Sequence, residues 1–141
     1  MTSSALISTN NSAWSLNLIP VSGTYAKVGV YSASFLSLTS SAMPLFDGDY
    51  YSVKMSYTTS TASLSVQKAE GDDIVYASTN VELDRIRFVW NLPQYIFLAG
   101  SGSSVTKFTG YMDEFRMWGE VISDDTFAKH VRYPGLYNGN T

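Results

Sequence analysis

The stretch FTGYMDEFRMWGEVISDDTF, residues Phe108–Phe127, carries more structural information than any other part of the chain. Apolar and polar residues alternate over Lys107–Trp118, which predicts a long strand, and Gly110 within it permits a bulge or a close backbone approach. Ser123 predicts the N-cap of a helix over about Asp124–Arg132, because a serine hydroxyl satisfies free amides at a helix start. The stretch therefore predicts a strand, a short link and a helix.

The alternation also assigns faces to the charged residues of this strand. Asp113 shares a face with Phe115 and Met117, so we expect a buried carboxylate that accepts hydrogen bonds from loop amides. Glu114 and Arg116 share the opposite face and are expected to form an ordinary surface ion pair.

The rest of the chain shows the same alternation, interrupted by turn residues at the spacing of an all-β sandwich. Asp47-Gly48 and Glu70-Gly71-Asp72-Asp73 are turn signals, and Pro134-Gly135 ends the predicted helix. The predicted strands are a short one at Ala5–Ser8, then Trp14–Ile19, Tyr25–Tyr31, Phe35–Thr39, Tyr50–Tyr57, Ala62–Lys68, Ile74–Ser78, Arg85–Trp90, Tyr95–Ala99 and Lys107–Trp118.

Inward-facing apolar positions of these strands predict the core. It comprises Trp14, Leu16, Leu18, Val28, Val30, Val53, Met55, Leu64, Val66, Ile86, Phe88, Trp90, Ile96, Leu98, Phe115 and Met117.

Composition narrows the function classes. With 141 residues the chain fits one domain, and its net charge of −3, without a basic run, disfavours nucleic acid as a partner. The absence of cysteine excludes disulfides and thiolate metal sites. No apolar run approaches the roughly 20 residues of a membrane span, so no membrane partner is predicted.

The C-terminal stretch resembles a known family. Its Gly110, Met112, Asp113, Glu114, Phe115, Arg116, Met117, Trp118 and Ser123 match the closing strand and capped helix of laminin G-like domains in the concanavalin A-like lectin/glucanase superfamily. The segment Asp47–Val53 is similar to the Asp-Gly strand opening of these domains. The resemblance implies an antiparallel β-sandwich of jelly-roll type with one short C-terminal helix, and a scaffold often used for carbohydrate recognition.

Such domains open with strands before the equivalent of Trp14. We therefore expect residues 1–141 to be a single lectin-like domain that lacks the opening strands, with residues 133–141 leading to a next segment. An exposed sheet edge would invite pairing with neighbouring subunits, so a larger assembly is expected. Composition and the family's use in tail fibres and adhesins together favour a virion or an extracellular or cell-surface location.

The carboxylates do not predict an enzyme. Retaining glycosidases of this fold place two carboxylates about 5–5.5 Å apart on one face, whereas the neighbours Asp113 and Glu114 would face opposite ways. His130 is the single histidine, which excludes a cluster of histidine ligands. We predict a protein without catalytic activity and without a cofactor.

Candidate ligand residues follow from the resemblance. Related domains often hold calcium, and the weak candidates here are Asp47 and Asp49 in one turn and Asp72 and Asp73 in another; neither turn matches an ordered ligand ladder. Sugar sites pair exposed aromatics with polar groups, which makes Tyr51, Tyr111 and Trp118 the candidates. The alternative is that these aromatics seal the sandwich.

The sequence thus predicts a lectin-like recognition or structural module that binds carbohydrate or neighbouring protein subunits. Two alternatives remain open: a glycan-active enzyme domain of the same fold, and a purely structural virion component that binds no sugar.

Overall fold

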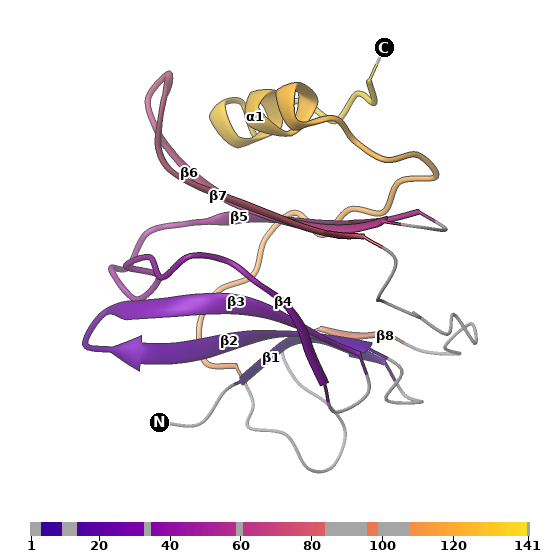
Figure 1. The fold of residues 1–141 in the computed structure, drawn as a ribbon. Helices are drawn as coiled ribbons and strands as arrows, with labels where there is room; N and C mark the ends of the chain where they lie inside the picture. The colour runs from indigo at the N-terminus through magenta and orange to yellow at the C-terminus, as the bar shows by residue number, and fades with distance from the viewer. Residues whose placement is uncertain are drawn as a thin grey trace.

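The described part of the chain forms two antiparallel sheets and one short helix (Figure 1). The computed structural model describes residues 4–9, 14–32, 35–58, 61–83, 96–98 and 108–140. Its elements are β1 (Ser4–Thr9), β2 (Trp14–Ser22), β3 (Tyr25–Ser32), β4 (Phe35–Thr39), β5 (Ser52–Tyr57), β6 (Thr61–Glu70), β7 (Asp73–Leu83), β8 (Ile96–Leu98) and α1 (Asp124–Arg132).

The larger sheet has the strand order β4-β3-β2-β1-β8, and the smaller has the order β5-β6-β7. Strands β1 to β4 and strands β5 to β7 pair with their neighbours in sequence, and β8 returns to pair with β1. The jelly-roll connectivity stays a prediction, since the predicted strand Arg85–Trp90 lies outside the described residues.

The inner faces of the two sheets share one core. In β2 the alternation turns Leu16 and Leu18 inward, and in β6 it turns Leu64 and Val66 inward, where both are fully buried. The buried cluster comprises Leu6, Trp14, Leu16, Leu18, Ala26, Val28, Val30, Leu38, Met43, Ala62, Leu64 and Val66. Burial of this apolar surface is the main favourable term in the folding of the two sheets.

Among the predicted core residues whose side chains the structure describes, most are confirmed and three are wrong. Val53 and Met55 pack against the cluster while partly buried. Leu98, Phe115 and Met117 are instead exposed, by 46%, 46% and 72%. Ile86, Phe88, Trp90 and the side chain of Ile96 lie outside the described residues.

The hairpin of β6 and β7 forms where its turn residues predict it. Glu70 pairs with Asp73, and Gly71 occupies the turn at a φ of 59°, a conformation that favours glycine. β5 begins at Ser52, so the predicted strand start at Tyr50 is two residues early. Tyr50 and Tyr51 belong to the preceding loop because that loop is tied to other elements by the contacts described below.

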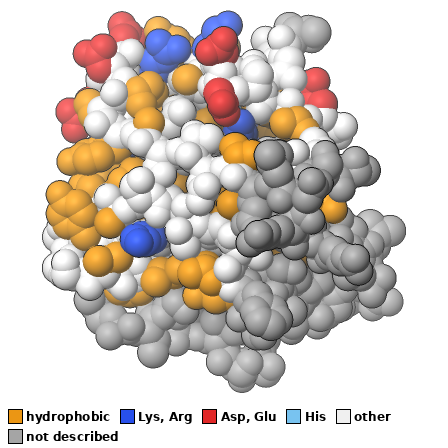
Figure 2. All heavy atoms as spheres, viewed as in Figure 1, with side chains coloured by type: hydrophobic (Ala, Val, Ile, Leu, Met, Phe, Trp, Pro, Cys, Tyr) orange, Lys and Arg blue, Asp and Glu red, His pale blue; other side chains and the backbone are white. Residues whose placement is uncertain are grey.

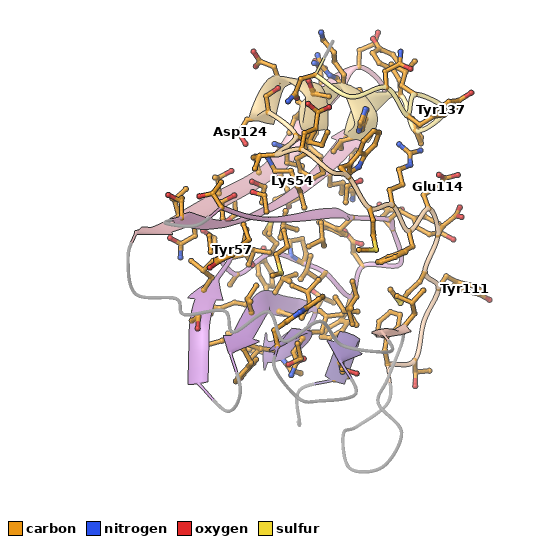
Figure 3. All side chains as sticks on the ribbon, turned by 90° about the vertical axis from the view of Figure 1, so that its right-hand side faces the viewer. Lys54, Tyr57, Tyr111, Glu114, Asp124 and Tyr137 are labelled. Carbon is orange, nitrogen blue, oxygen red and sulfur yellow. The ribbon has the colours of Figure 1, made fainter. Side chains whose placement is uncertain are left out.

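Helix α1 forms a third layer on the outer face of the smaller sheet (Figure 1). Its bounds are those predicted, and the Ser123 hydroxyl accepts a hydrogen bond from the amide of Thr126 at 3.2 Å. Phe127 is the buried residue of α1. The Nζ atom of Lys54, a residue of β5, lies 5.5 Å from the centroid of the Phe127 ring. The same Nζ donates to the Ile122 carbonyl at 2.8 Å and to Asp124 Oδ1 at 2.9 Å (Figure 3).

The predicted strand at Lys107–Trp118 is wrong: Phe108–Trp118 is irregular. Its backbone turns at Glu114, whose φ is 55°, and the Glu114 amide donates to Asp113 Oδ1 at 2.9 Å. Such a local side-chain bond competes with a strand ladder. Asp113 is therefore exposed, and the prediction of a buried acceptor for several loop amides is wrong as well.

We expect the substitution Asp113→Ala to lower the free energy of unfolding by no more than about 0.5 kcal/mol, because an exposed carboxylate with one local bond contributes little. Arg116→Ala should cost about 1 kcal/mol, since the Arg116 guanidinium donates to the carbonyls of Leu136 and Pro134. Urea unfolding of both variants measures the difference. A larger loss for Asp113→Ala than for Arg116→Ala would contradict this assignment.

Candidate functional site

The loop between β4 and β5, residues 40–51, is fixed to the neighbouring elements by backbone hydrogen bonds. Met43 and Ala26 exchange two bonds of 2.9 Å in an isolated bridge to β3. The Phe46 amide donates to the Thr24 carbonyl in the β2–β3 turn at 3.0 Å. These contacts hold the loop across one end of the two sheets.

Lys68 of β6 ties the same loop to the smaller sheet. Its Nζ lies 3.1 Å from Asp47 Oδ2, 2.6 Å from Asp49 Oδ2 and 3.6 Å from Glu70 Oε1. The Lys68 side chain is only 7% exposed, while those of Asp49 and Glu70 are 61% and 65% exposed. One buried ammonium thus draws three carboxylates together, two of them from the loop.

Two tyrosine rings complete the surroundings of this ammonium. Lys68 Nζ lies 5.4 Å from the ring centroid of Tyr51 and 6.0 Å from that of Tyr76, within the range of cation–π attraction. The two rings are 6.3 Å apart. The Tyr51 hydroxyl lies 2.8 Å from Asp47 Oδ2 and 3.2 Å from the Pro44 carbonyl, so it can donate to either oxygen.

These contacts shift three pKa values. Burial raises the pKa of Asp47, but hydrogen bonds from the Asp49 amide, Tyr51 and Lys68 outweigh it and leave the pKa below its ordinary value. The pKa of Tyr51 is raised by burial and by its bond to Asp47. The pKa of Lys68 is raised by its hydrogen bond to Asp49, against the effect of burial. The shifts of Asp47 and Lys68 favour their ion pair at neutral pH, and the shift of Tyr51 keeps its hydroxyl protonated as a donor.

The lowered pKa of Asp47 predicts a loss of stability in acid. Its stabilising contribution is complete above the unfolded pKa of about 4 and is lost as the pH falls through the folded pKa. We expect the unfolding free energy of the wild type to fall more steeply below about pH 4 than that of Asp47→Asn. Chemical unfolding at several pH values measures both slopes. Equal slopes would show that Asp47 is not stabilised as a carboxylate.

Aromatic side chains cluster at this end of the molecule. Tyr25, Phe46, Tyr50 and Tyr76 are exposed by 45%, 43%, 65% and 37%. We call these four residues, with the half-buried Tyr51, the aromatic end. In Figure 2 hydrophobic side chains gather at the left edge, where the β2–β3 turn and the loop after β4 lie in Figure 1, with acidic side chains above them. The aromatic end therefore offers flat apolar surface beside carboxylates.

The structure separates the three predicted sugar-binding residues. Tyr51 lies in the aromatic end, but its hydroxyl and ring are engaged with Asp47 and Lys68. Tyr111 and Trp118 belong to the irregular C-terminal segment, where Tyr111 is 86% exposed and points outward (Figure 3). Among the described residues no hydrogen bond or ring contact joins Tyr51 to either of the other two.

Three of the four weak calcium candidates, Asp47, Asp49 and Asp72, have other partners. Lys68 pairs with Asp47 and Asp49, so its ammonium occupies the position between these carboxylates that a calcium ion would need. Asp72 accepts a hydrogen bond from the Tyr133 hydroxyl at 3.1 Å, and Asp73 begins β7. Within the described ranges no group of three or more His, Cys, Asp or Glu is arranged to hold a metal ion.

Other residues of the C-terminal stretch hold the tail after α1. Arg116 donates to the carbonyls of Leu136 at 2.6 Å and Pro134 at 2.7 Å, and it forms the predicted ion pair with Glu114 at 2.8 Å. The Trp118 ring stacks on His130 of α1, with centroids 5.6 Å apart. Gly110 admits a close approach, as a Cβ there would lie 2.5 Å from the Phe108 ring. Arg116 and Trp118 therefore bind the tail and α1 to the segment before the helix.

A shallow cavity of about 150 Å³ lies between α1 and the tail. Its wall includes His130, whose Nε2 lies 2.8 Å from the Asn138 carbonyl. Asn140 closes the tail onto the helix start, accepting a hydrogen bond from the Ser123 amide at 2.8 Å and donating to the Val121 carbonyl at 2.9 Å. The polar groups around the cavity are thus largely used by the protein itself.

Lys68 is not identified from the sequence, nor are the exposed Phe46, Tyr50 and Tyr76 near it. One signal was present: Lys68 follows Leu64 and Val66 at even spacing, which predicts a charged side chain on the inward face of β6. Such a charge needs partners when buried. The sequence does not specify which carboxylates these are, because Asp47 and Asp49 lie about twenty positions away.

Comparison of the chain with family models, curated proteins and solved structures gives no match. The laminin G-like resemblance therefore stays a prediction. In the part of the chain that the structure describes, no helix has the length and apolar character needed to span a membrane.

Proposed function

We propose that this chain is a non-catalytic, lectin-like recognition module of a virion or cell-surface protein, with a concanavalin A-like jelly-roll fold, and that it binds carbohydrate at the aromatic end. The exposed tyrosine and phenylalanine rings that gather on one fixed loop and its neighbours carry the proposal.

The chemistry of the surface suits a sugar. Tyr50 and Phe46 present ring area to solvent, and an aromatic face packs well against the apolar C–H face of a pyranose. The carboxylates of Asp49 and Glu70 are exposed beside them, and each retains acceptor sites that Lys68 does not use. Sugar hydroxyls can donate to these oxygens.

The loop is also organised before any ligand arrives. Its bonds to Thr24, Ala26 and Lys68 fix the backbone that carries the rings. Binding to a rigid surface loses less conformational entropy than binding that orders a mobile loop. Because less entropy is lost, each contact with the ligand needs to contribute less binding free energy.

A glycan array followed by titration tests the proposal. For any glycan that binds, Tyr50→Ala should weaken the affinity by about tenfold or more, as for an exposed aromatic at the centre of an interface. Tyr111→Ala is the matched control, because it removes an even more exposed tyrosine from another part of the surface. Absence of binding to every glycan, or equal losses in the two variants, would contradict the proposal.

A second candidate function is that of a structural assembly component. The observation in its favour is the apolar exposure of the C-terminal segment, where Tyr111, Met117 and Tyr137 are exposed by 86%, 72% and 71%. In that case this surface packs on a neighbouring protein subunit. Light scattering tests it: self-association that Met117→Ser abolishes supports assembly, and a monomer at all concentrations contradicts assembly with copies of this chain.

A further inference from the structure

The aromatic end carries an excess of negative charge. Asp47, Asp49 and Glu70 bring three carboxylates to the one ammonium of Lys68, so this group of four side chains beside Tyr50 and Tyr51 has a net charge of −2. The Lys68 ammonium is buried and already engaged by all three, so it is not available to an anionic ligand. A ligand that approaches the rings of Tyr50 and Tyr51 therefore meets the oxygens of Asp49 and Glu70 rather than the Lys68 ammonium.

The exposure of these groups decides which of them a ligand can reach. The side chains of Asp49 and Glu70 are more than half exposed, whereas that of Asp47 is 25% exposed and accepts from Tyr51 as well as from Lys68. An ionised carboxylate has about four acceptor positions, and Lys68 takes only one of them at Asp49. Asp49 and Glu70 thus remain free to bind donors beside the rings.

From this charge and ring arrangement we infer that the preferred ligand is a glycan with free amino groups, a cationic amino sugar. Its ammonium groups would pair with Asp49 and Glu70 while its ring packs on Tyr50. The inference rests on the proposed carbohydrate function and adds the charge of the ligand to it. Sialylated, sulfated and uronic acid glycans are disfavoured, since they would bring like charges to exposed carboxylates.

Two oligosaccharides of equal length test the inference, one of glucosamine and one of N-acetylglucosamine, because they differ chiefly in charge. We expect the glucosamine oligomer to bind about tenfold more tightly at low salt, as for one or two screened charge pairs. The preference should shrink at high salt. Glu70→Gln and Asp49→Asn should reduce it, with melting curves to confirm that each variant is folded.

The variant Asp125→Asn is the control for non-specific attraction of a cation to an acidic protein. Asp125 is exposed on α1, so this variant loses the same charge away from the aromatic end. An equal reduction of the preference by Asp125→Asn and Glu70→Gln would overturn the inference. So would glucosamine binding that Tyr50→Ala does not weaken.

The two proposals fail in different ways. Equal or tighter binding of the N-acetylated oligomer, or preferred binding of an oligouronate, would overturn the amino-sugar preference and leave carbohydrate recognition standing. No binding of any of these probes, together with a blank glycan array, would overturn the proposed function itself.

Discussion

Leu64→Ala is expected to lower the free energy of unfolding by about 2–5 kcal/mol, a large part of the stability of a domain of this size. Leu64 is fully buried at the centre of β6 and belongs to the cluster that both sheets share. Truncation removes apolar contacts and leaves a cavity between two layers that cannot both relax to fill it. Urea unfolding monitored by circular dichroism measures the loss.

Leu36→Ala is the matched control, since it removes the same atoms from a side chain that is 48% exposed on β4. It should cost about 1 kcal/mol or less, in proportion to its partial burial. Comparable losses for the two leucines would show that the shared core is not where the structure places it.

Phe127→Ala is expected to cost about 3 kcal/mol and to loosen α1 from the smaller sheet. Phe127 is the buried residue of this helix, and Lys54 loses a ring beneath its ammonium when it is removed. The remaining polar contacts, from Lys54 to Asp124 and from Arg116 to the tail, end on exposed partners and contribute less. Thermal unfolding gives the overall loss.

Hydrogen exchange shows where the Phe127 substitution acts. Amides of α1 should exchange faster in Phe127→Ala, while those of β2 and β3 in the other sheet keep their relative protection. Tyr137→Ala, at a tail residue 71% exposed, provides the control for loss of an aromatic ring. Unchanged protection of α1 in Phe127→Ala would contradict the role of this residue as the anchor of the helix.

Local patterns in the sequence account for much of the fold. The period-two alternation of Trp14, Leu16 and Leu18 predicts both the strand and its inward face, because one face of each sheet is covered by the other sheet. The bounds of α1 follow from Ser123 and Pro134, since caps and breakers act through nearby backbone groups. These features depend on neighbours in the chain, so they can be predicted without knowing the tertiary structure.

The wrong prediction of a strand at Phe108–Trp118 arises because contacts with distant parts of the chain decide the structure there. Its alternation is as regular as that of β2, yet the strand does not form, because Glu114 turns the backbone and Arg116 binds the tail after α1. Local alternation alone cannot predict that a distant pair of carbonyls takes the Arg116 donors. Tertiary context overrides intrinsic strand preference in such cases.

The candidate site was the least predictable part. The sequence identifies Tyr51 as a candidate sugar ligand but does not predict its contacts with Asp47 and Lys68. The exposed Tyr50 and Phe46 were not singled out, since exposure depends on how the loop crosses the sheet ends. Residues that meet only through the fold cannot be grouped from sequence spacing.

A nuclear magnetic resonance titration with the best glycan from an array tests most directly whether the aromatic end binds carbohydrate, as proposed. The structure predicts that resonances of Phe46, Tyr50 and Tyr76 shift with added glycan while those of Tyr111 and Met117 do not. Shifts confined to the C-terminal segment, or no shifts with any glycan at millimolar concentration, would contradict it.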